Sequence, residues 1–208
     1  MTKSPFLVNI IDKSEFNLLL LDLIKQNEES GKLLTYCGIG SRSTPSYMLT
    51  YMRRIAKRLE HQLFTLYTGG AFGADTAFLA GTQIYKVFMP SHIHNQRISN
   101  RLDFIDCSDF PNWEEAVQTV YKYHPNPSTL NNFGISLMAR NAYCVLGEDL
   151  KSPVDFVLCW TPNGRDIGGT SQALRIARDY NIPIFNLAFD QILKDVISAV
   201  KLTEFDIR

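Results

Sequence analysis

The chain has no excess of charge of either sign and no long apolar run. Its 208 residues include 21 lysines and arginines and 21 aspartates and glutamates, so the formal net charge is zero. Attraction of the whole molecule to nucleic acid or to an anionic membrane is therefore not expected, although a local patch stays open. The longest apolar run near the start, 16–24, contains Asn17 and Asp22 and is far too short to span a membrane. We expect no membrane partner.

Cysteine is also scarce, and the spacing of the cysteines argues against a fold held together by zinc or by disulfides. The four cysteines, which form no CxxC pair, are Cys37, Cys107, Cys144 and Cys159. Because the cysteines lie mostly in apolar runs, we interpret them as small buried side chains in a reducing compartment. This pattern is not typical of a zinc site or a disulfide framework. No basic and apolar leader precedes residue 16, so we expect a cytoplasmic protein. His92 and His94 have metal-compatible spacing but no acidic or cysteine partners nearby, so we predict neither a metal nor a cofactor.

Hydrophobic residues make up 45% of the chain and charged residues 20%, as in an ordinary globular protein. Buried strands are predicted at 33–37, 63–67, 84–89, 154–160 and 182–187. Helical periodicity predicts helices from 16 to about 31, from 45 to 59, and over 75–80, 113–123, 131–147, 170–180 and 189–200. Because strands alternate with helices, we predict an α/β fold with a Rossmann-like, doubly wound, mainly parallel sheet and helices on both faces. One domain over 1–208 is the simplest division, with an N-terminal helix in 1–31 and a core over 33–201.

Glycine-rich segments follow three of these strands, and each precedes a predicted helix. They are Gly38-Ile-Gly40-Ser41-Arg42, Gly69-Gly70-Ala-Phe-Gly73 and Gly168-Gly169-Thr170-Ser171. Parallel strands end at one edge of their sheet, where α/β proteins bind ligands. Missing β-carbons let backbone N–H groups approach an anion, and helix N-termini add partial positive charge. A single glycine loop after a strand is as often only a tight turn as a binding site. Three such loops at one edge favour a phosphate-bearing, nucleotide-like ligand.

Six side chains are candidates for contacts with this ligand, among them Arg140 and Asn141, which we expect to flank it. Arg42 has the fork geometry for a bidentate phosphate contact, and the hydroxyls of Thr170 and Ser171 are donors that also suit a helix cap. Asp75 either accepts from a sugar hydroxyl, positions a water, or only stabilises a helix start. Arg140, beside Asn141, falls opposite the apolar stripe of its helix, so it is either a solvent-exposed arginine or a ligand contact.

Two stretches of the sequence resemble known families. "GIGSRSTP" followed by "YTGGAFGADTAFLAG" resembles the opening of the DprA/Smf family of DNA-processing proteins, which has a GSR turn and then a glycine and aspartate segment. "LMARNAYCVLG" through "GGTSQALRIARDYNIPIFNL" is similar to the Lonely Guy (LOG) nucleotide phosphoribohydrolases. Both families belong to the SMF/DprA–LOG (SLOG) superfamily of Rossmann-like proteins. The resemblance covers residues 33–190 and is to compact members of the phage and mobile-element type.

The resemblance implies ligand-binding roles for Arg140, Gly169, Thr170 and Asp75, and it leaves a homo-oligomer open. The LOG families carry a catalytic glutamate where this chain has Ala173. Cleavage of a ribosyl–base bond passes through an oxocarbenium-like state that a carboxylate stabilises, so whether the chain is an enzyme stays undecided. Asp75 and Asp166 are the two carboxylates that are candidates to replace the missing catalytic glutamate.

Three hypotheses on function follow. The first is a binding protein, as sensor or sequestering protein, for a nucleotide or nucleotide-derived small molecule at the carboxyl edge of the sheet. The second is a nucleotide N-glycosidase, or phosphoribohydrolase, related to the LOG enzymes. The third is DprA-like binding of single-stranded DNA, for which the basic stretch that contains Arg53 and Arg54 is the candidate surface; the alternative for that stretch is the solvated face of a helix.

Overall fold

The computed structural model describes residues 15–91 and 104–202. Its strands form one six-stranded, fully parallel sheet in the order β4-β3-β2-β1-β5-β6. The strands are β1 (Leu34–Gly40), β2 (Phe64–Thr68), β3 (Tyr85–Met89), β4 (Phe104–Asp106), β5 (Phe156–Trp160) and β6 (Ile184–Asn186). This is the Rossmann-like, doubly wound α/β fold that the alternating pattern predicts.

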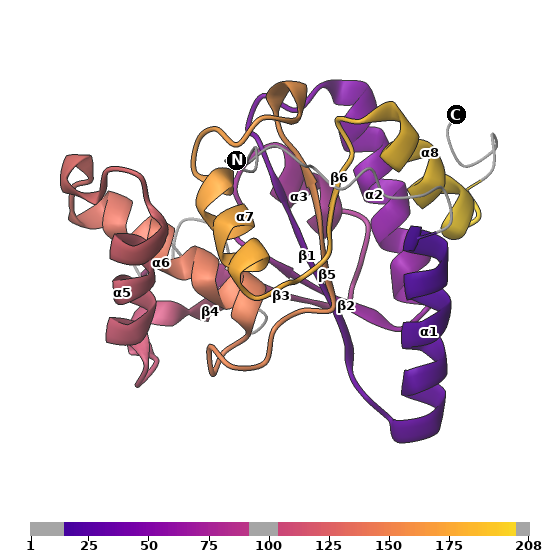
Figure 1. The fold of residues 1–208 in the computed structure, drawn as a ribbon, viewed down its shortest axis with the longest axis horizontal. Coiled ribbons are helices and arrows are strands. Elements are labelled where there is room, and N and C mark those ends of the chain that lie inside the picture. Colours follow the sequence, from indigo (N-terminus) through magenta and orange to yellow (C-terminus); the bar gives the residue numbers. More distant parts are fainter. Residues whose placement is uncertain (1–14, 92–103, 203–208) are drawn as a thin grey trace, which may run out of the picture.

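Helices cover both faces of the sheet (Figure 1). The described helices are α1 (Glu15–Ser30), α2 (Ser46–His61), α3 (Ala74–Leu79), α5 (Trp113–Tyr123), α6 (Asn132–Leu146), α7 (Thr170–Asp179) and α8 (Asp190–Ala199), with 3-10 turns at Cys107–Asp109, Pro127–Thr129 and Pro162–Gly164. In Figure 1, α1, α2 and α8 lie on one side of the sheet, and α5, α6 and α7 on the other. The predicted helix boundaries agree with these to within a few residues.

The sheet lies between two hydrophobic clusters, one on each face. The first cluster includes Tyr36 and Phe156 of the central strands and the inner faces of α1, α2, α3 and α8. The second includes Val157 of β5 and the inner faces of α5, α6 and α7. Every residue of β1 and β2 is buried, because alternate side chains enter the two clusters. This explains why these strands read as continuous apolar runs rather than as alternating ones.

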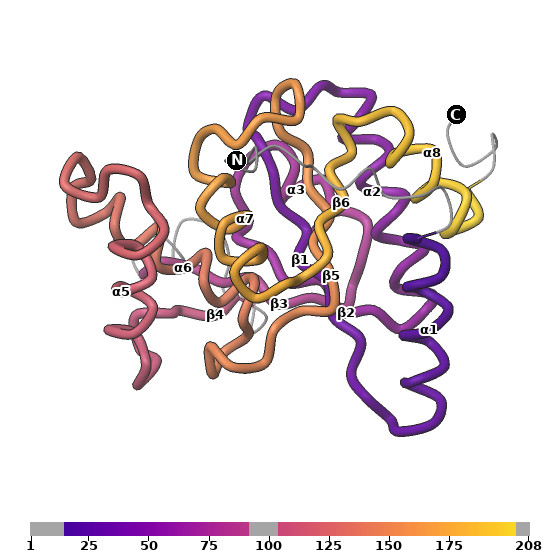
Figure 2. Tube along the Cα trace, viewed as in Figure 1, coloured from indigo at the N-terminus to yellow at the C-terminus, as the bar shows by residue number. Residues whose placement is uncertain are grey.

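The order of strands reverses between β1 and β5. From β1 the chain moves outward through β2, β3 and β4, and it then returns to place β5 and β6 on the other side of β1. Figure 2 follows this path, with β1 and β5 side by side in the middle of the molecule. The register pairs Gly40 with Trp160 at the carboxyl ends of the two strands. Loops that leave these ends diverge to opposite faces, which opens a crevice for a ligand.

Two features of the sheet differ from the sequence prediction. β4 is a strand of three residues in a stretch that showed no strand pattern. β1 continues to Gly40, whereas the sequence places its end at Cys37. Gly38 and Gly40 are therefore ladder residues, paired with Leu158 and Trp160, and not the loop residues we expected.

Candidate functional site

A cavity of about 510 Å³ lies at the carboxyl ends of β1 and β5, at the point where the strand order reverses. Its volume is within the range of natural small-molecule sites. Nine of the fourteen predicted site residues line it: Gly40, Ser41, Arg42, Asp75, Arg140, Asn141, Gly168, Gly169 and Thr170. Five do not, namely Gly38, Gly69, Gly70, Gly73 and Ser171. The sequence therefore brings the three glycine segments to one edge, but only part of each segment faces the cavity.

The glycines of β1 make room for packing. A β-carbon at Gly38 would lie 2.7 Å from Leu66 Cδ1 and 2.9 Å from the ring of Phe78. At Gly40 it would lie 2.6 Å from the β-carbon of Ala74. Both positions therefore need glycine because α3 and β2 approach the strand closely, which is a packing reason distinct from contact with an anion.

Asp75, on the first turn of α3, accepts hydrogen bonds from the loops around it. Its Oδ1 accepts from the Gly40 N–H at 3.1 Å, and its Oδ2 accepts from the Ala71 N–H at 3.3 Å. The Ser41 N–H is also occupied, since it donates to the Trp160 carbonyl at 3.0 Å. The prediction that the first two glycine segments offer their amides to a ligand is thus wrong for these three N–H groups. The Asp75 carboxylate takes the place of an external anion for Gly40 and Ala71, and the Trp160 carbonyl does so for Ser41.

Gly73 joins the first two glycine segments to each other. It has a φ of +92°, which favours glycine, and a β-carbon there would lie 2.5 Å from the Ser41 carbonyl oxygen. The Ala74 N–H donates to the same carbonyl at 3.4 Å. The two loops therefore pack as one unit that holds Ser41 and Arg42 at the rim of the cavity.

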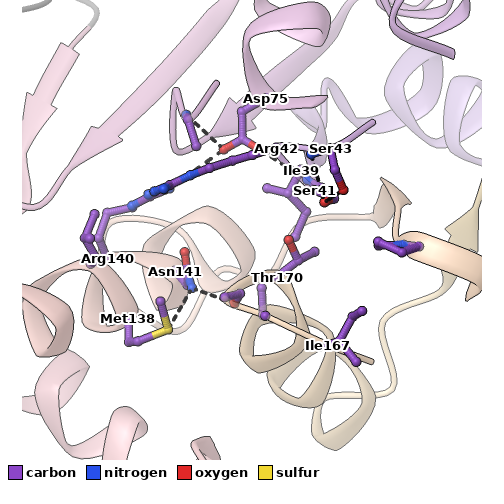
Figure 3. A pocket seen from close by; sticks show the side chains of 17 residues that line it. Ile39, Ser41, Arg42, Ser43, Asp75, Met138, Arg140, Asn141, Ile167 and Thr170 are labelled. Atoms are coloured by element: carbon purple, nitrogen blue, oxygen red, sulfur yellow. Dashed lines mark hydrogen bonds and ion pairs between the residues drawn. The ribbon is translucent and has the colours of Figure 1, made fainter. Parts of the chain in front are cut away.

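Arg140 is a buried cation and not the solvent-exposed arginine that its helical position allowed. It is 6% exposed and lines the cavity. Its Nη1 lies 3.9 Å from Asp75 Oδ2 and 3.9 Å from the Cys144 sulfur, and its Nε has no hydrogen-bond partner. Figure 3 shows Arg140 and Asp75 pointing toward each other at one side of the cavity. Buried N–H donors without acceptors cost free energy. Because this buried guanidinium has so few close acceptors, the site around it lacks a hydrogen-bond partner.

Burial sets the protonation of this pair. It raises the pKa of Asp75 above its ordinary value, although Arg140 and the amides of Ala71 and Gly40 act in the opposite direction. Burial also lowers the pKa of Arg140, but the Cys144 thiol and the Asp75 carboxyl outweigh it and raise this pKa. Arg140 therefore keeps its charge, and the positive charge at this end of the cavity is only partly neutralised.

In the third glycine segment the Ser171 N–H is occupied, since it donates to the Gly168 carbonyl at 3.2 Å, but within the described residues the other three amides are not. No acceptor among the described residues takes the backbone N–H of Gly168, Gly169 or Thr170. Gly169 stands at the N-cap of α7, and no side chain caps this helix. The Ser171 hydroxyl, which we expected to face the ligand or cap the helix, is buried and donates to the Gly168 carbonyl at 2.7 Å. This segment presents unused donors and the positive end of a helix dipole to the cavity.

Asn141 ties α6 to this third segment. Its side-chain amide donates to the Gly169 carbonyl at 3.3 Å, and a weaker contact reaches the Met138 sulfur at 3.9 Å (Figure 3). The N-terminus of α6 is itself set by Asn131, whose side chain accepts from the Gly134 N–H. Arg140 and Asn141 thus both line the cavity, one toward Asp75 and one toward the α7 loop.

An apolar wall completes the cavity, and sequence analysis did not identify it. Its members are Ile39, Leu137, Met138, Pro162, Ile167 and Ala173. Leu137 and Met138 lie just before Arg140 on α6. Their closeness in sequence to this candidate arginine was the one feature that could have predicted their place in the cavity wall. Ser43 also lines the cavity, and its hydroxyl lies 2.8 Å from that of Ser41. The site therefore has a cationic, donor-rich part and an apolar part.

Asp75 is the one carboxylate among the described residues that line the cavity. Ala173, which the sequence resemblance alone aligns with the LOG glutamate, also lines it. Asp166, the other candidate substitute, is absent from the lining and forms an ion pair with Arg178. The carboxylate chemistry of a LOG-type hydrolase therefore has a single buried candidate here.

The described residues hold no group of three or more His, Cys, Asp or Glu side chains that suits a metal ion. All four cysteines are buried and unpaired to one another. His92 and His94 lie outside the described residues. Within the ranges 15–91 and 104–202, no helix combines the length and the apolar character that a membrane span needs.

Strand order and edge cavity together define an α/β protein of the Rossmann-like class with a small-molecule-sized site at its switch point. No family model matches the chain, and no curated protein matches it significantly. Among solved structures it is similar to DNA processing protein A from Helicobacter pylori, which was studied for a unique mode of binding single-stranded DNA. The two are 17% identical, the match covers 82% of each chain, and the TM-score is 0.49. The fold assignment comes from the strand order itself.

Proposed function

We propose that the protein binds a nucleotide or nucleotide-derived small molecule in the cavity between the carboxyl ends of β1 and β5. The observation that carries this proposal is Arg140, a buried guanidinium that lines the cavity with an unpartnered Nε and a nearest carboxylate oxygen 3.9 Å away. An anionic or acceptor-rich ligand would complete its hydrogen bonding. The protein's own acceptors leave that cation under-compensated, at a free-energy cost of a few kcal/mol for a buried charged group.

The charged part of the ligand belongs at the α7 end of the cavity. Free N–H groups of Gly168, Gly169 and Thr170 meet there at the N-terminus of a ten-residue helix. The Thr170 hydroxyl and the exposed Arg42 guanidinium complete a donor set that suits a phosphate group. The amides of Gly40 and Ala71 play no part in it, because Asp75 already occupies them.

The uncharged part of the ligand belongs against the apolar wall. Leu137 and Met138 approach from α6, and Ile167 from the loop before α7. Methionine adapts its shape to flat rings and makes favourable sulfur contacts with them. A phosphate joined to a nucleobase-like ring matches this division of the cavity into a donor-rich part and an apolar part better than inorganic phosphate does.

Binding without cleavage is the role we propose, as a sensor or a sequestering protein. The N-glycosidase alternative needs a carboxylate beside the ribosyl carbon, and Ala173 supplies none. Asp75 is 3% exposed and is held by two amides, which suits a structural carboxylate more than a mobile base. The single-stranded DNA alternative stays a prediction, and its residues Arg53 and Arg54 lie on α2, outside the lining of this cavity.

Calorimetric titration with a panel of nucleoside monophosphates, and with the matching nucleosides, tests the proposal. We expect at least one phosphorylated compound to bind, with at least ~10-fold weaker binding of its nucleoside, because a charge-assisted hydrogen bond contributes about 1.5–3 kcal/mol. Arg140→Met should weaken binding similarly. The exposed Arg165, which is outside the cavity lining, supplies the matched control Arg165→Met, which should bind like wild type.

Loss of Arg140 leaves the buried Asp75 without its cation, so Arg140→Met is paired with Arg140→Lys, which keeps the charge but not the fork. Native mass spectrometry of the purified protein would identify a ligand that co-purifies. Release of free base from any nucleotide of the panel would support the N-glycosidase alternative instead. Absence of binding for every compound at millimolar concentration, with a folded protein, would reject the proposed site.

A further inference from the structure

The outer side of α2 carries a second hollow, which shares no lining residue with the cavity described above. It consists of two adjoining depressions, of about 490 and 540 Å³, which share Arg53 and Arg54. We call the two together the α2 groove. Its described lining comprises Leu49, Thr50, Arg53, Arg54, Lys57, Arg58, His61, Gly73, Thr76, Ala77, Ala80, Gly81 and Leu202. It runs along α2 beside α3, with which α2 packs.

Basic side chains in the α2 groove form two rows along the helix. Arg53, Lys57 and His61 are spaced four residues apart, and Arg54 and Arg58 form a parallel row with the same spacing. Residues four apart on a helix are neighbours, about 6 Å apart along the axis. The first row therefore extends over about 12 Å. Like charges at this spacing destabilise a helix, so the rows oppose the stability of α2.

The helix dipole does not explain the rows. Cations near the C-terminus of a helix are favourable, but the effect decays within the last turn. In α2 the last turn contains Arg58 and His61, whereas Arg53, Arg54 and Lys57 lie further toward the N-terminus. Neighbouring acids do not explain the first row either, since Arg53, Lys57 and His61 form no ion pair with any residue that the structure describes.

The remaining lining points to the chemistry of the occupant. Within the described part of the chain, the α2 groove has no carboxylate and no Phe, Tyr or Trp in its wall, and the imidazole of His61 is its one ring. It otherwise offers charge and small side chains such as Ala77, Ala80 and Gly81, and a single ring is too few to stack successive bases. We propose that the α2 groove binds a linear chain of phosphate groups through its charge, without reading any bases.

This proposal is independent of the nucleotide cavity. Ala71 faces the cavity and Gly73 faces the groove, so the two sites lie on either side of one short loop and share no lining residue. A phosphate chain has two sources, the backbone of a nucleic acid and free inorganic polyphosphate. Both present the same repeated anionic groups to Arg53 and Lys57, and the experiment separates them.

The test is calorimetric or anisotropy titration with three polyanions of matched length: inorganic polyphosphate, an oligothymidylate and polyglutamate. We expect a phosphate chain to bind at low salt, and log K to fall with log salt. Arg53→Glu with Lys57→Glu should weaken binding at least ~10-fold and flatten the salt slope by about 1 for each phosphate that the variant no longer neutralises. Both side chains are exposed, so the double variant should stay folded.

Lys151→Glu with Lys194→Glu is the matched control, since both lysines are exposed, lie outside the groove lining and give the same change in net charge. It should bind within ~2-fold of wild type. Binding of the oligothymidylate alone, or of polyphosphate alone, identifies the source and supports the site. No binding at low salt, equal weakening in both double variants, or equally tight binding of polyglutamate would overturn the proposal. Nucleotide binding in the cavity should be unchanged in both double variants, which keeps this result separate from the first proposal.

Discussion

The guanidinium of Arg140 lies directly over Gly69, so that a β-carbon at position 69 would stand 1.0 Å from Nη1. Gly69 does not line the cavity, yet it leaves the space in which the arginine that lines it is held. This explains why a glycine of the second segment belongs to the site without touching a ligand. Its contribution is to the position of Arg140, next to Asp75.

Gly69→Ala should weaken ligand binding with little effect on folding. The atoms that the new methyl group meets are the far end of a flexible side chain, so the guanidinium moves and the backbone stays. We expect a loss of affinity of at least ~5-fold, from a displaced charge-assisted contact. Calorimetry on Gly69→Ala, Arg140→Met and the double variant checks this. If both changes act through the same guanidinium, the double variant binds no more weakly than Arg140→Met, whereas additive losses would contradict that link.

Gly38→Ala should destabilise the fold, in contrast to Gly69→Ala. A methyl group at position 38 meets Leu66 and the ring of Phe78, both buried in the first cluster. Overpacking a close-packed core costs about 1–3 kcal/mol. Urea denaturation of the variant and of wild type measures this loss directly. A free energy of unfolding within ~0.5 kcal/mol of wild type would show that α3 does not hold the strand as closely as described.

Asp75 should make stability fall as pH rises. Burial raises its folded pKa above the ordinary value of 3.8, so the native state holds the proton more tightly than the unfolded chain. The protonated form stabilises the fold fully below pH 3.8, and this contribution is lost as pH rises through the raised pKa. The free energy of unfolding of wild type minus that of Asp75→Asn should therefore decrease from below pH 3.8 toward neutrality. An increase would mean that Arg140 and the amides outweigh burial.

The sequence was sufficient for the architecture because its signal is periodic. Fully buried parallel strands such as β2 are apolar throughout, and the helices between them are amphipathic, so element types and order are readable. β4 was missed because three residues, Phe104–Asp106, are too few to show a period. The end of β1 was misplaced because Gly38 and Gly40 look like a turn, whereas packing against Phe78 and Ala74 is what requires them.

The site was only partly readable, since hydrogen bonding and burial depend on the third dimension. The sequence placed Asp75 and the amides of the first two segments at one edge of the sheet. It did not show that Asp75 accepts hydrogen bonds from Gly40 and Ala71. Arg140 falls opposite an apolar stripe, yet residues 139–146 of α6 are all buried, so no face of that half of the helix is solvent-exposed. The apolar wall has no motif, because Leu137 or Ile167 alone carries no chemical signature.

The free amides of the third segment give the most direct test of the central claim. In a ¹⁵N-labelled sample titrated with the nucleotide that calorimetry selects, the N–H resonances of Gly168, Gly169 and Thr170 should shift most among the backbone amides of the three glycine segments. Those of Gly40 and Ala71, already bonded to Asp75, should shift less, and the unphosphorylated nucleoside should leave all of them nearly unmoved. Shifts confined to the α2 groove, or equal shifts with the nucleoside, would contradict an anion held at the N-terminus of α7.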